Sequence, residues 1–447
     1  MTSAEQGALR ARLTAGEVAV IGLGKSGLAA SRLAEREGAQ VYGSDSKGEG
    51  HDLARIARAS LAIVSPGVPP NAPPVEAARR AGVPVISEVE LALWFLPATR
   101  IIAVTGTNGK TTTTALIAHL LRALGADAEA AGNIGLALSE VALRPTPPAW
   151  VALEMSSFQL HDTLSLNPIV GVLTNLSPDH LDRYAGVDEY YADKDRLFLN
   201  AGKESIWVTN ADDVEVLRRT ARVKGTHNRF SVAGLQVEAR YDDGHNDLRL
   251  FDDLLVQRDQ VPLIGAHNVA NVLAALLAVA SADRAYTTRP ARERLRLGVT
   301  TFAALPHRLE VVADAGGVIW INDSKATNVA SARVAIEGMT RPTIVLLGGR
   351  HKGESYASLA AALATHARHV IAYGEAAALV EHDLGGRVPL TRLESSFDEV
   401  MRRARELAAP GDAVLLTPAC SSFDMFTNYE ERGATFRRLA GGEAPSA

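Results

Sequence analysis

The residues most able to do chemistry lie in the stretch TGTNGKTT, residues 105–112. Glycines allow backbone N–H groups to converge on phosphate oxygens, a lysine adds a full positive charge, and a threonine hydroxyl can hold Mg²⁺. The strict phosphate-loop pattern has another glycine five places before Gly109, where this chain has Val104. The stretch is therefore a shortened loop, Thr-Gly-x-x-Gly-Lys-Thr. It predicts a cradle for nucleotide phosphates; the alternative is a strand–helix turn without a ligand.

Three residues further along the chain could bind a metal ion or move a proton. Glu154 ends an apolar run, and a carboxylate there, beside a phosphate loop, can coordinate Mg²⁺. The alternative is a surface carboxylate. His180 could be a metal ligand or a substrate contact, although a loop histidine is more often only solvated. Lys194 lies between two aspartates in a predicted helix, where a solvated, salt-bridged face is the ordinary interpretation.

Polar residues also gather where later segments begin or end. HNVAN, residues 267–271, opens a helix in which an asparagine could face a base edge or could cap and pack the first turn. NDSKATN, residues 322–328, contains one apolar side chain and places Lys325 after a predicted strand. Its polar density favours a binding site over a plain loop with an N-cap. PACSSFD, residues 418–424, holds the equivalent position after the last predicted strand.

A second glycine pattern lies near the N-terminus. Gly22, Gly24 and Gly27 form G-x-G-x-x-G between a predicted strand and a predicted helix, and Asp45 ends the next strand. This is the dinucleotide-binding fingerprint, with Asp45 placed for a ribose hydroxyl. Alone it predicts a NAD-type ligand; the alternative is a tight β–α turn that binds nothing.

Most of these motifs lie at predicted strand ends, so parallel α/β sheets must position them. Apolar runs that alternate with helical segments predict three α/β domains, residues 1–97, 98–298 and 299–447. Residues 225–262 lack helical periodicity and predict a small antiparallel excursion, and the charged residues 287–298 predict a connector. The longer predicted helices cover residues 110–124, 188–200, 268–282, 328–338, 357–368 and 397–409.

Composition and charge exclude several classes of protein. The chain has 447 residues and a formal net charge of −5, which argues against a nucleic-acid binder with a strongly basic surface. Cys420 is the only cysteine, so intramolecular disulfides and cysteine-based zinc sites are excluded. The N-terminus lacks the apolar core of a signal peptide, and the longest apolar run, residues 269–280, is too short to span a bilayer. We therefore predict a soluble cytoplasmic protein.

Taken together and in order, the motifs resemble those of the Mur ligases of peptidoglycan synthesis. The matching stretches are TGTNGKTT, GNIG (132–135), LEMSSFQL (153–160), NLSPDHLDRY (175–184), HNVAN, PHRLE (306–310), NDSKATN, LLGGRHKG (346–353) and TPACSSFDMF. The first marks only a wider superfamily that includes folylpolyglutamate synthetases, whereas NDSKATN and PACSSFDMF resemble the members that add D-glutamate. The resemblance spans essentially the whole chain. It implies a Rossmann-like N-terminal domain, a central P-loop ATPase-type parallel sheet and a Rossmann-like C-terminal domain.

The resemblance also implies an activity. It implies an ATP-dependent ligase that adds D-glutamate to UDP-N-acetylmuramoyl-L-alanine through an acyl phosphate and a tetrahedral intermediate, releasing ADP and phosphate. Two Mg²⁺ ions are expected as cofactors. Lys194 is expected to react with CO₂ and form a carbamate, an anion able to coordinate the second ion. We expect a monomer with no nucleic-acid partner and no membrane span.

Individual residues receive roles from the same resemblance. The residues implied in ATP binding are Gly106, Thr107, Asn108, Gly109, Lys110, Thr111, Thr112, Asn268, Asn271, Arg308 and Asp323. Those implied in binding the UDP-muramyl substrate are Lys25, Ser26, Asp45, Ser46, Ser65, Pro66, Gly67, Asn133 and His180. The D-glutamate contacts are Thr327, Lys352, Ser422 and Phe423; the metal ligands are Thr111, Glu154, His180 and carbamylated Lys194; the catalytic residues are Lys110, His180, Lys194 and Lys325. Tyr429 stands where the family often has phenylalanine, and Lys25 and Arg350 lie at variable loop positions.

Three other functions compete with this assignment. A different Mur-type ligase would use another amino acid. A NAD-dependent dehydrogenase would rest on the G-x-G-x-x-G turn and Asp45, in a domain where the resemblance implies UDP binding. A nucleotide-gated binding protein without activity would need to have lost Glu154, His180, Lys194 and Lys325, all of which are present.

Overall fold

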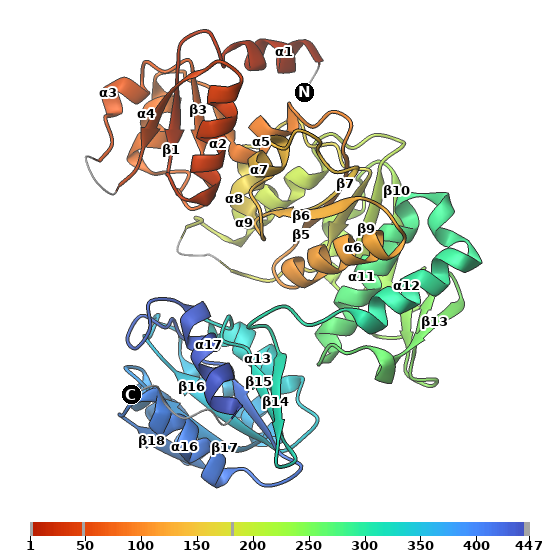
Figure 1. Cartoon of the computed structure of the whole chain (residues 1–447), viewed down its shortest axis with the longest axis vertical. Coiled ribbons are helices and arrows are strands. Elements are labelled where there is room, and N and C mark those ends of the chain that lie inside the picture. Colours follow the sequence, from red (N-terminus) through yellow and green to blue (C-terminus); the bar gives the residue numbers. More distant parts are fainter. Residues whose placement is uncertain (1–2, 47–49, 180–182, 442–447) are drawn as a thin grey trace. The chain divides into compact units, whose positions relative to one another are not determined.

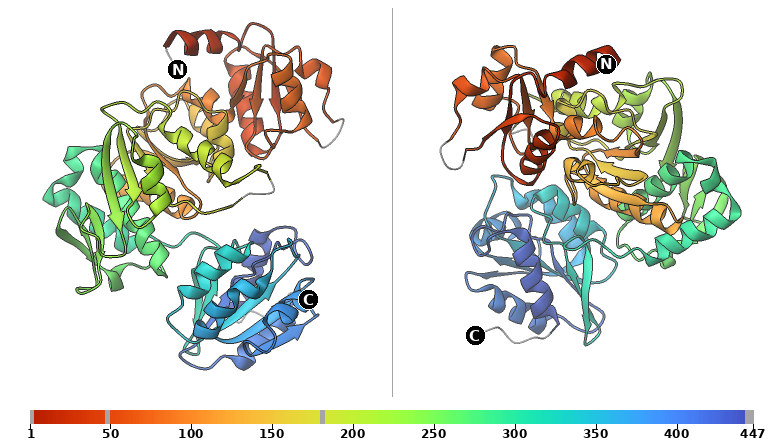
Figure 2. Two further views of the ribbon diagram at one scale, coloured as in Figure 1. Left: turned by 180° about the vertical axis from the view of Figure 1, so that it is seen from behind. Right: turned by 45° about the horizontal axis from the view of Figure 1, so that its top comes forward.

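The structure is a computed structural model that describes residues 3–46, 50–179 and 183–441. The chain forms two compact units: the first comprises Met1–Val261 and Val269–Phe302, and the second comprises Pro262–Asn268 and Ala303–Ala447. The first unit contains a four-stranded and a nine-stranded sheet, and the second contains a six-stranded sheet (Figure 1). Helices pack against each sheet, as two further views show (Figure 2). The predicted α/β class is confirmed.

The four-stranded sheet near the N-terminus is entirely parallel. Its strands are β1 (Glu17–Ile21), β2 (Gln40–Ser44), β3 (Leu61–Val64) and β4 (Val85–Ser87), in the order β2-β1-β3-β4. Its helices are α1 (Ser3–Ala11), α2 (Lys25–Arg36), α3 (Leu53–Ile56), α4 (Pro73–Arg80) and α5 (Glu88–Leu93). Side chains of a strand alternate between its faces. Val18 and Val20 accordingly pack in the core that contains α2, whereas Ala19 and Ile21 pack with α3 and α4.

The nine-stranded sheet has the order β13-β12-β11-β10-β9-β8-β5-β7-β6. Its strands are β5 (Arg100–Thr105), β6 (Ala128–Gly132), β7 (Trp150–Glu154), β8 (Val170–Leu173), β9 (Ile206–Asn210), β10 (Thr226–Ser231), β11 (Ala239–Asp242), β12 (Asp247–Leu250) and β13 (Asp253–Gln257). Strands β5 to β11 pair in parallel, and only β11-β12 and β12-β13 are antiparallel. The predicted excursion is therefore confirmed for β11 to β13, while β10 continues the parallel sheet.

The helices of this part of the first unit include one that the sequence pattern missed. They are α6 (Lys110–Ala123), α7 (Leu138–Ala142), α8 (Ser157–His161), α9 (Val187–Asp195), α10 (Val214–Thr220), α11 (Ala266–Ala282) and α12 (Arg289–Thr301). The predicted connector was wrong, because its residues form α12. Leu295 and Val299 are buried one turn apart, and Gly298 lies against Leu120 and Ala123 of α6. The buried apolar face of α12 is narrow and arginines surround it, so the composition of residues 287–298 resembles that of a linker.

The second unit has the strand order β14-β15-β19-β16-β17-β18. Its elements are β14 (Glu310–Ala315), β15 (Val318–Asn322), α13 (Val329–Glu337), β16 (Thr343–Gly348), η4 (Tyr356–Leu359), α14 (Ala360–His366), β17 (Ala367–Tyr373), α15 (Ala377–Leu384), β18 (Leu390–Leu393), α16 (Phe397–Leu407), β19 (Ala413–Leu416) and α17 (Tyr429–Ala440). Only β14 runs antiparallel to its neighbour. The helix predicted over 357–368 is too long, because β17 begins at Ala367.

Helices cover both faces of this sheet. Val345 and Leu347 point to the core shared with α13, α14 and α15, whereas Ile344 and Leu346 point to the core shared with α16 and α17. Because β15, β19 and β16 are neighbours in parallel, NDSKATN, Thr417-Pro418 and Gly348-Gly349 meet at one edge of the sheet, as predicted. In the described part of the chain, no helix has the length and apolarity needed to cross a bilayer.

Candidate active site

The loop between β5 and α6 has a conformation that requires its two glycines. Gly106 and Gly109 have φ of +145° and +81°. A Cβ at Gly106 would overlap the hydroxyl of Thr174, and a Cβ at Gly109 would overlap the side-chain oxygen of Asn271. Gly109 is also the N-cap of α6 and provides no side-chain cap. The positive end of the α6 helix therefore lies at this loop, where it favours an anion.

The loop that follows β8 fixes this turn in place. Asn175 accepts from the backbone N–H of Asn108 at 2.8 Å and donates to its carbonyl at 3.0 Å. Thr174 donates to the same carbonyl at 2.7 Å, and the Thr107 hydroxyl donates to Ser177 O at 3.1 Å. These contacts were not predicted. Their only signal in the sequence was the run of polar residues after a predicted strand.

Two lysines converge on one carbonyl of the loop. Lys110 Nζ donates to Gly106 O at 3.0 Å and to Thr107 O at 2.7 Å, and Lys194 Nζ donates to Gly106 O at 2.6 Å. Lys194 is only 1% exposed and its Nζ lies 4.6 Å from the centre of the Tyr190 ring. The solvated helix face expected as the ordinary interpretation is therefore wrong. Burial, followed by the charge of Lys110, holds the pKa of Lys194 well below its usual range.

Glu154 presents an oxygen that no group of the described residues satisfies. Its side chain is 1% exposed, and Oε1 accepts from Asn133 Nδ2 at 2.9 Å. Oε2 is buried without a hydrogen-bond partner among the described residues. A buried, unpaired carboxylate oxygen is costly unless a cation joins it. This oxygen and the half-buried Thr111 at the start of α6 are donors of the kind that Mg²⁺ prefers.

The described side chains alone do not complete a metal site. Within residues 3–46, 50–179 and 183–441, no three histidine, cysteine, aspartate or glutamate side chains gather around one point. His180, predicted as a metal ligand and substrate contact, lies outside the described residues. A carbamate on Lys194 would add the missing oxygen ligand beside Glu154, so the residues present fit Mg²⁺ in that form.

The N-terminal glycine turn is held by its own neighbours. Gly22 has φ of +87°, and a Cβ at Gly27 would overlap Gly22 O. Ser65 Oγ donates to that carbonyl at 2.6 Å, and Asp45 Oδ2 accepts from Leu23 N at 2.6 Å. One oxygen of Asp45 therefore stabilises the turn. The other predicted residues here are more open: Lys25 and Ser46 are exposed and Ser26 is half-buried.

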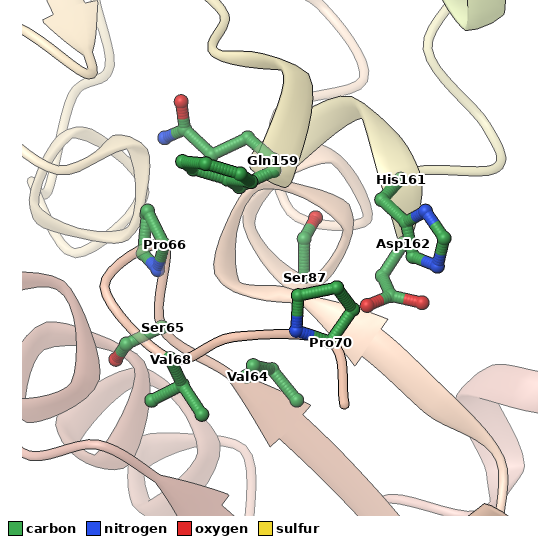
Figure 3. A pocket seen from close by; sticks show the side chains of 10 residues that line it. Val64, Ser65, Pro66, Val68, Pro70, Ser87, Gln159, His161 and Asp162 are labelled. Atoms are coloured by element: carbon green, nitrogen blue, oxygen red, sulfur yellow. The ribbon is translucent and has the colours of Figure 1, made fainter. Parts of the chain in front are cut away.

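A pocket lies where the end of β3 meets α8, within the first unit (Figure 3). It is lined by Val64, Ser65, Pro66, Val68, Pro70, Ser87, Phe158, Gln159, His161 and Asp162. The Gln159 side chain is buried, and its oxygen accepts from Ser156 N at 3.0 Å while its Nε2 has no partner among the described residues. The pocket thus combines two predicted residues, Ser65 and Pro66, with an unused amide donor. Gly67, the third, is exposed beside them.

In the second unit, Asp323 follows β15 and is buried. Its Oδ1 accepts from Leu309 N at 3.2 Å and its Oδ2 from the Thr417 hydroxyl at 3.3 Å. Burial raises the pKa of Asp323 to about 7, and the nearby charge of Arg308 opposes this rise. The structure therefore places the predicted residues Arg308 and Asp323 close together.

The predicted amino-acid contacts occupy three loops at the same sheet edge. Lys325 Nζ lies 5.4 Å from the centre of the Tyr429 ring, so the aromatic character of this position is kept. Lys352 Nζ approaches the Thr327 hydroxyl at 3.5 Å. Ser422 is buried, whereas Phe423 is 59% exposed.

Arg432 was not predicted and lies beneath these loops. It is fully buried and donates to the hydroxyl of Ser324 at 2.9 Å and to its carbonyl at 2.8 Å. It also donates to the carbonyls of Cys420 and Ser421 at 3.2 and 3.3 Å. A positive charge is thus held under two loops of the site. The sequence gives no sign of this, because Arg432 lies in a polar helix.

The predicted nucleotide contacts are divided between the units. Asn271 lies in the first unit against Gly109, whereas Asn268, Arg308 and Asp323 lie in the second. Asn268 Nδ2 donates to Ile264 O at 2.8 Å. Their joint action on one nucleotide remains a prediction.

Comparison with known proteins identifies the class. Residues 104–279 match the Mur ligase middle domain, and residues 307–420 match the Mur ligase glutamate ligase domain. The chain therefore belongs to the Mur ligase family. It is 39% identical to UDP-N-acetylmuramoylalanine–D-glutamate ligase of Salinibacter ruber, over 94% of this chain and 96% of that protein. It is 40% identical to the protein of the same name from Anaeromyxobacter dehalogenans, over 96% and 98%.

Solved structures agree on the fold. The MurF ligase of Thermotoga maritima, in complex with ADP, matches with a TM-score of 0.63 and 17% identity over 97% of this chain and 99% of that one. UDP-N-acetylmuramate–alanine ligase of the same organism matches with a TM-score of 0.61 and 18% identity over 96% and 100%. The fold is thus shared across Mur ligases with different substrates.

Proposed function

We propose that this chain is an ATP-dependent ligase that joins D-glutamate to UDP-N-acetylmuramoyl-L-alanine and releases ADP and phosphate. The observation that carries the proposal is the convergence of Lys110 and Lys194 on Gly106 O. Glu154, which interacts electrostatically with Lys194, has an oxygen without a partner among the described residues. Full-length relatives at 39% and 40% identity that bear this ligase's name support the choice of substrates.

In the proposed reaction the alanyl carboxylate attacks the γ-phosphate of ATP. Two anions must approach each other, and like charges about 4 Å apart repel by roughly 4 kcal/mol at an effective dielectric of about 20. Lys110 and the first N–H groups of α6 provide compensating positive charge at the loop. A carboxylate is already an adequate nucleophile, so this step needs no general base.

Mg²⁺, when bound, would neutralise charge on the phosphates. Thr111, Glu154, His180 and Lys194 as a carbamate are the proposed ligands. The depressed pKa of Lys194 favours its neutral amine, the form whose lone pair forms the N–C bond with CO₂. The nitrogen forms a bond to the CO₂ carbon and loses one proton to water, so the product is a carbamate anion. Burial favours the neutral amine but also disfavours the charge of the carbamate, whereas the positive charge of Lys110 disfavours the ammonium and stabilises the carbamate anion.

The UDP-muramyl substrate is proposed to bind along the N-terminal sheet edge. Lys25, Ser26, Asp45 and Ser46 would face the uridine diphosphate. Ser65, Pro66 and Gly67 would lie next, and Asn133 would contact the muramyl part. Asn133 already donates to Glu154, so it would link this substrate to the proposed metal ligand.

D-glutamate is proposed to bind at the edge of the second unit's sheet. Lys325, Thr327 and Lys352 would hold its carboxylates or the developing charge, with Ser422 and the backbone at Phe423. The amine must lose a proton before it attacks the acyl phosphate. His180 and a phosphate oxygen are the two candidate acceptors.

Phosphate release tests the proposal. The purified chain is given ATP, Mg²⁺ and UDP-N-acetylmuramoyl-L-alanine with D-glutamate, L-glutamate, L-lysine or diaminopimelate in turn. We expect release only with D-glutamate. Release with a different amino acid would identify another Mur-type ligase, and release that needs no UDP substrate would overturn the assignment.

A further inference from the structure

A buried hydrogen-bonded chain lies in the second unit, behind the three loops of the amino-acid site. The Tyr356 hydroxyl lies 3.0 Å from His351 Nδ1 and 2.9 Å from Cys420 Sγ. Tyr356 is 1% exposed and Cys420 is fully buried. One phenol oxygen therefore joins two loops that are distant in sequence. His351 precedes Lys352, and Cys420 lies two residues before Ser422.

The thiol and the phenol of this chain are neutral. Burial raises the pKa of the Cys420 thiol to about 11 and also raises the pKa of the Tyr356 phenol, so both keep their protons near pH 7. Sulfur is a weak acceptor, which favours a thiol that donates to the phenol oxygen and a phenol that donates to His351 Nδ1. The phenol oxygen then accepts one hydrogen bond and donates another, so it joins both loops.

The backbone ties these loops together at the same place. Arg350 N donates to Ser421 O at 2.9 Å, and Ser421 N donates to Arg350 O at 3.2 Å. Ala419 N donates to Ala326 O at 2.9 Å, which connects the loop that carries Thr327. Ala419 itself has φ of +57°, an unfavourable conformation for alanine that the surrounding bonds must maintain. These backbone bonds and the buried Arg432 hold the backbones of the loops, and the Tyr356 hydroxyl adds a link between their side chains.

We propose that Tyr356 is a positioning residue for the amino-acid substrate, whose hydroxyl fixes Lys352 relative to Ser422. The inference rests on the proposed function, because it deepens the assignment of the D-glutamate site. Tyr356 would not touch the substrate. It would act through the loops on either side, by holding His351 and Cys420 at a common oxygen.

The ring and backbone of Tyr356 have separate anchors. Its ring packs in the core that includes Leu359, Val345 and Leu363. Its N–H donates to Asp383 Oδ2 at 2.8 Å, and so does the hydroxyl of Ser355 at 2.8 Å. Tyr356→Phe should therefore keep the turn and the core and remove only the link between the loops.

The experiment compares Tyr356→Phe with a matched control. Thr343→Val removes another buried hydroxyl from the same unit, one that donates to Arg341 O at the opposite end of β16. We expect the KM for D-glutamate to rise about fivefold or more in Tyr356→Phe, with kcat and the KM for ATP unchanged. Thr343→Val should leave all three constants unchanged. Thermal unfolding of both variants checks that each is folded.

A double variant sharpens the test. His351→Gln should raise the same KM, and adding Tyr356→Phe should produce no further rise, because both changes break one link. An unchanged KM in Tyr356→Phe, or an equal rise in Thr343→Val, would overturn the inference. If the unchanged chain does not ligate D-glutamate at all, the proposed function fails instead, so the two failures are distinguishable.

Discussion

Two turns of the first unit are built from nearly the same residues and differ in what they can bind. Gly24-Lys25-Ser26 follows β1 and opens α2, and Gly109-Lys110-Thr111 follows β5 and opens α6. In the first, the lysine is exposed and Gly24 has no atom within 4 Å of a Cβ position. In the second, the lysine donates to two loop carbonyls.

The difference teaches that glycine spacing defines a turn, whereas the surrounding charges define its ligand. Around Gly109, helix α9 supplies a second lysine, and the end of β7 supplies a carboxylate oxygen without a partner among the described residues. Around Gly24 the turn uses Asp45 and Ser65 for its own support. The arrangement around Gly109 suits a triphosphate with metal. The arrangement around Gly24 suits a ligand bound mainly by shape and backbone.

Replacing each lysine tests the comparison most strongly. Lys110→Ala should lower kcat by about 100- to 1,000-fold, because compensating charge at the phosphates is lost. Lys25→Ala should alter only the KM for the UDP substrate. Phosphate release with all substrates measures both. Equal losses of kcat in the two variants would contradict the distinction between the turns.

Adding a methyl group tests which glycines are structural. Gly27→Ala should lower the free energy of unfolding by about 2–3 kcal/mol, because its Cβ would overlap Gly22 O. Gly24→Ala should change it by less than about 0.5 kcal/mol, since that position is open and has φ of −69°. Urea unfolding measures both values. A tolerated Gly27→Ala would show that the turn can relax.

Removing CO₂ tests whether Lys194, which lies beside the loop at Gly109, acts as a carbamate. Buffer freed of CO₂ and bicarbonate should lower the activity of the unchanged chain about tenfold, with recovery when bicarbonate is added. Lys194→Ala should be inactive in both buffers. The initial rate of phosphate release is the measurement. If bicarbonate does not change the initial rate of phosphate release, Lys194 acts as an amine and not as a carbamate.

Changing Asp45 tests whether the turn at Gly24 binds the UDP substrate. Asp45→Asn keeps an acceptor for Leu23 N but removes the charge, and we expect the KM for the UDP substrate to rise about three- to fivefold. The KM for ATP should not change. A tight complex with NADH, measured by fluorescence titration, would instead revive the dinucleotide interpretation of this turn.

Local patterns predicted most of the fold, and the failures have identifiable causes. The glycine turn between β5 and α6 and the strands that precede NDSKATN and PACSSFD were predicted because apolar runs and glycines act locally. Strand β6 was missed because AEAAG, its sequence, has no β-branched residue. The helix α12 was missed because its arginines conceal a narrow apolar stripe.

The site was harder to predict than the fold. Lys194 has aspartates on both sides and resembles a surface lysine, yet tertiary packing buries it against Tyr190. Arg432 and Tyr356 gain their partners from loops that are far away in sequence. Such contacts depend on which strands become neighbours, and no spacing within a motif contains that information.

The position of β19 has a consequence for how the protein is made. This strand, residues Ala413–Leu416, lies between β15 and β16 in the second unit's sheet, although it is the last to leave the ribosome. Until then β15 and β16 have no common partner and expose unpaired edges. A nascent chain interrupted before this strand would lack the centre of the sheet. The sheet of this unit can therefore fold completely only after β19 is available, and chains truncated before β19 should be recognised by proteases or chaperones as unfolded.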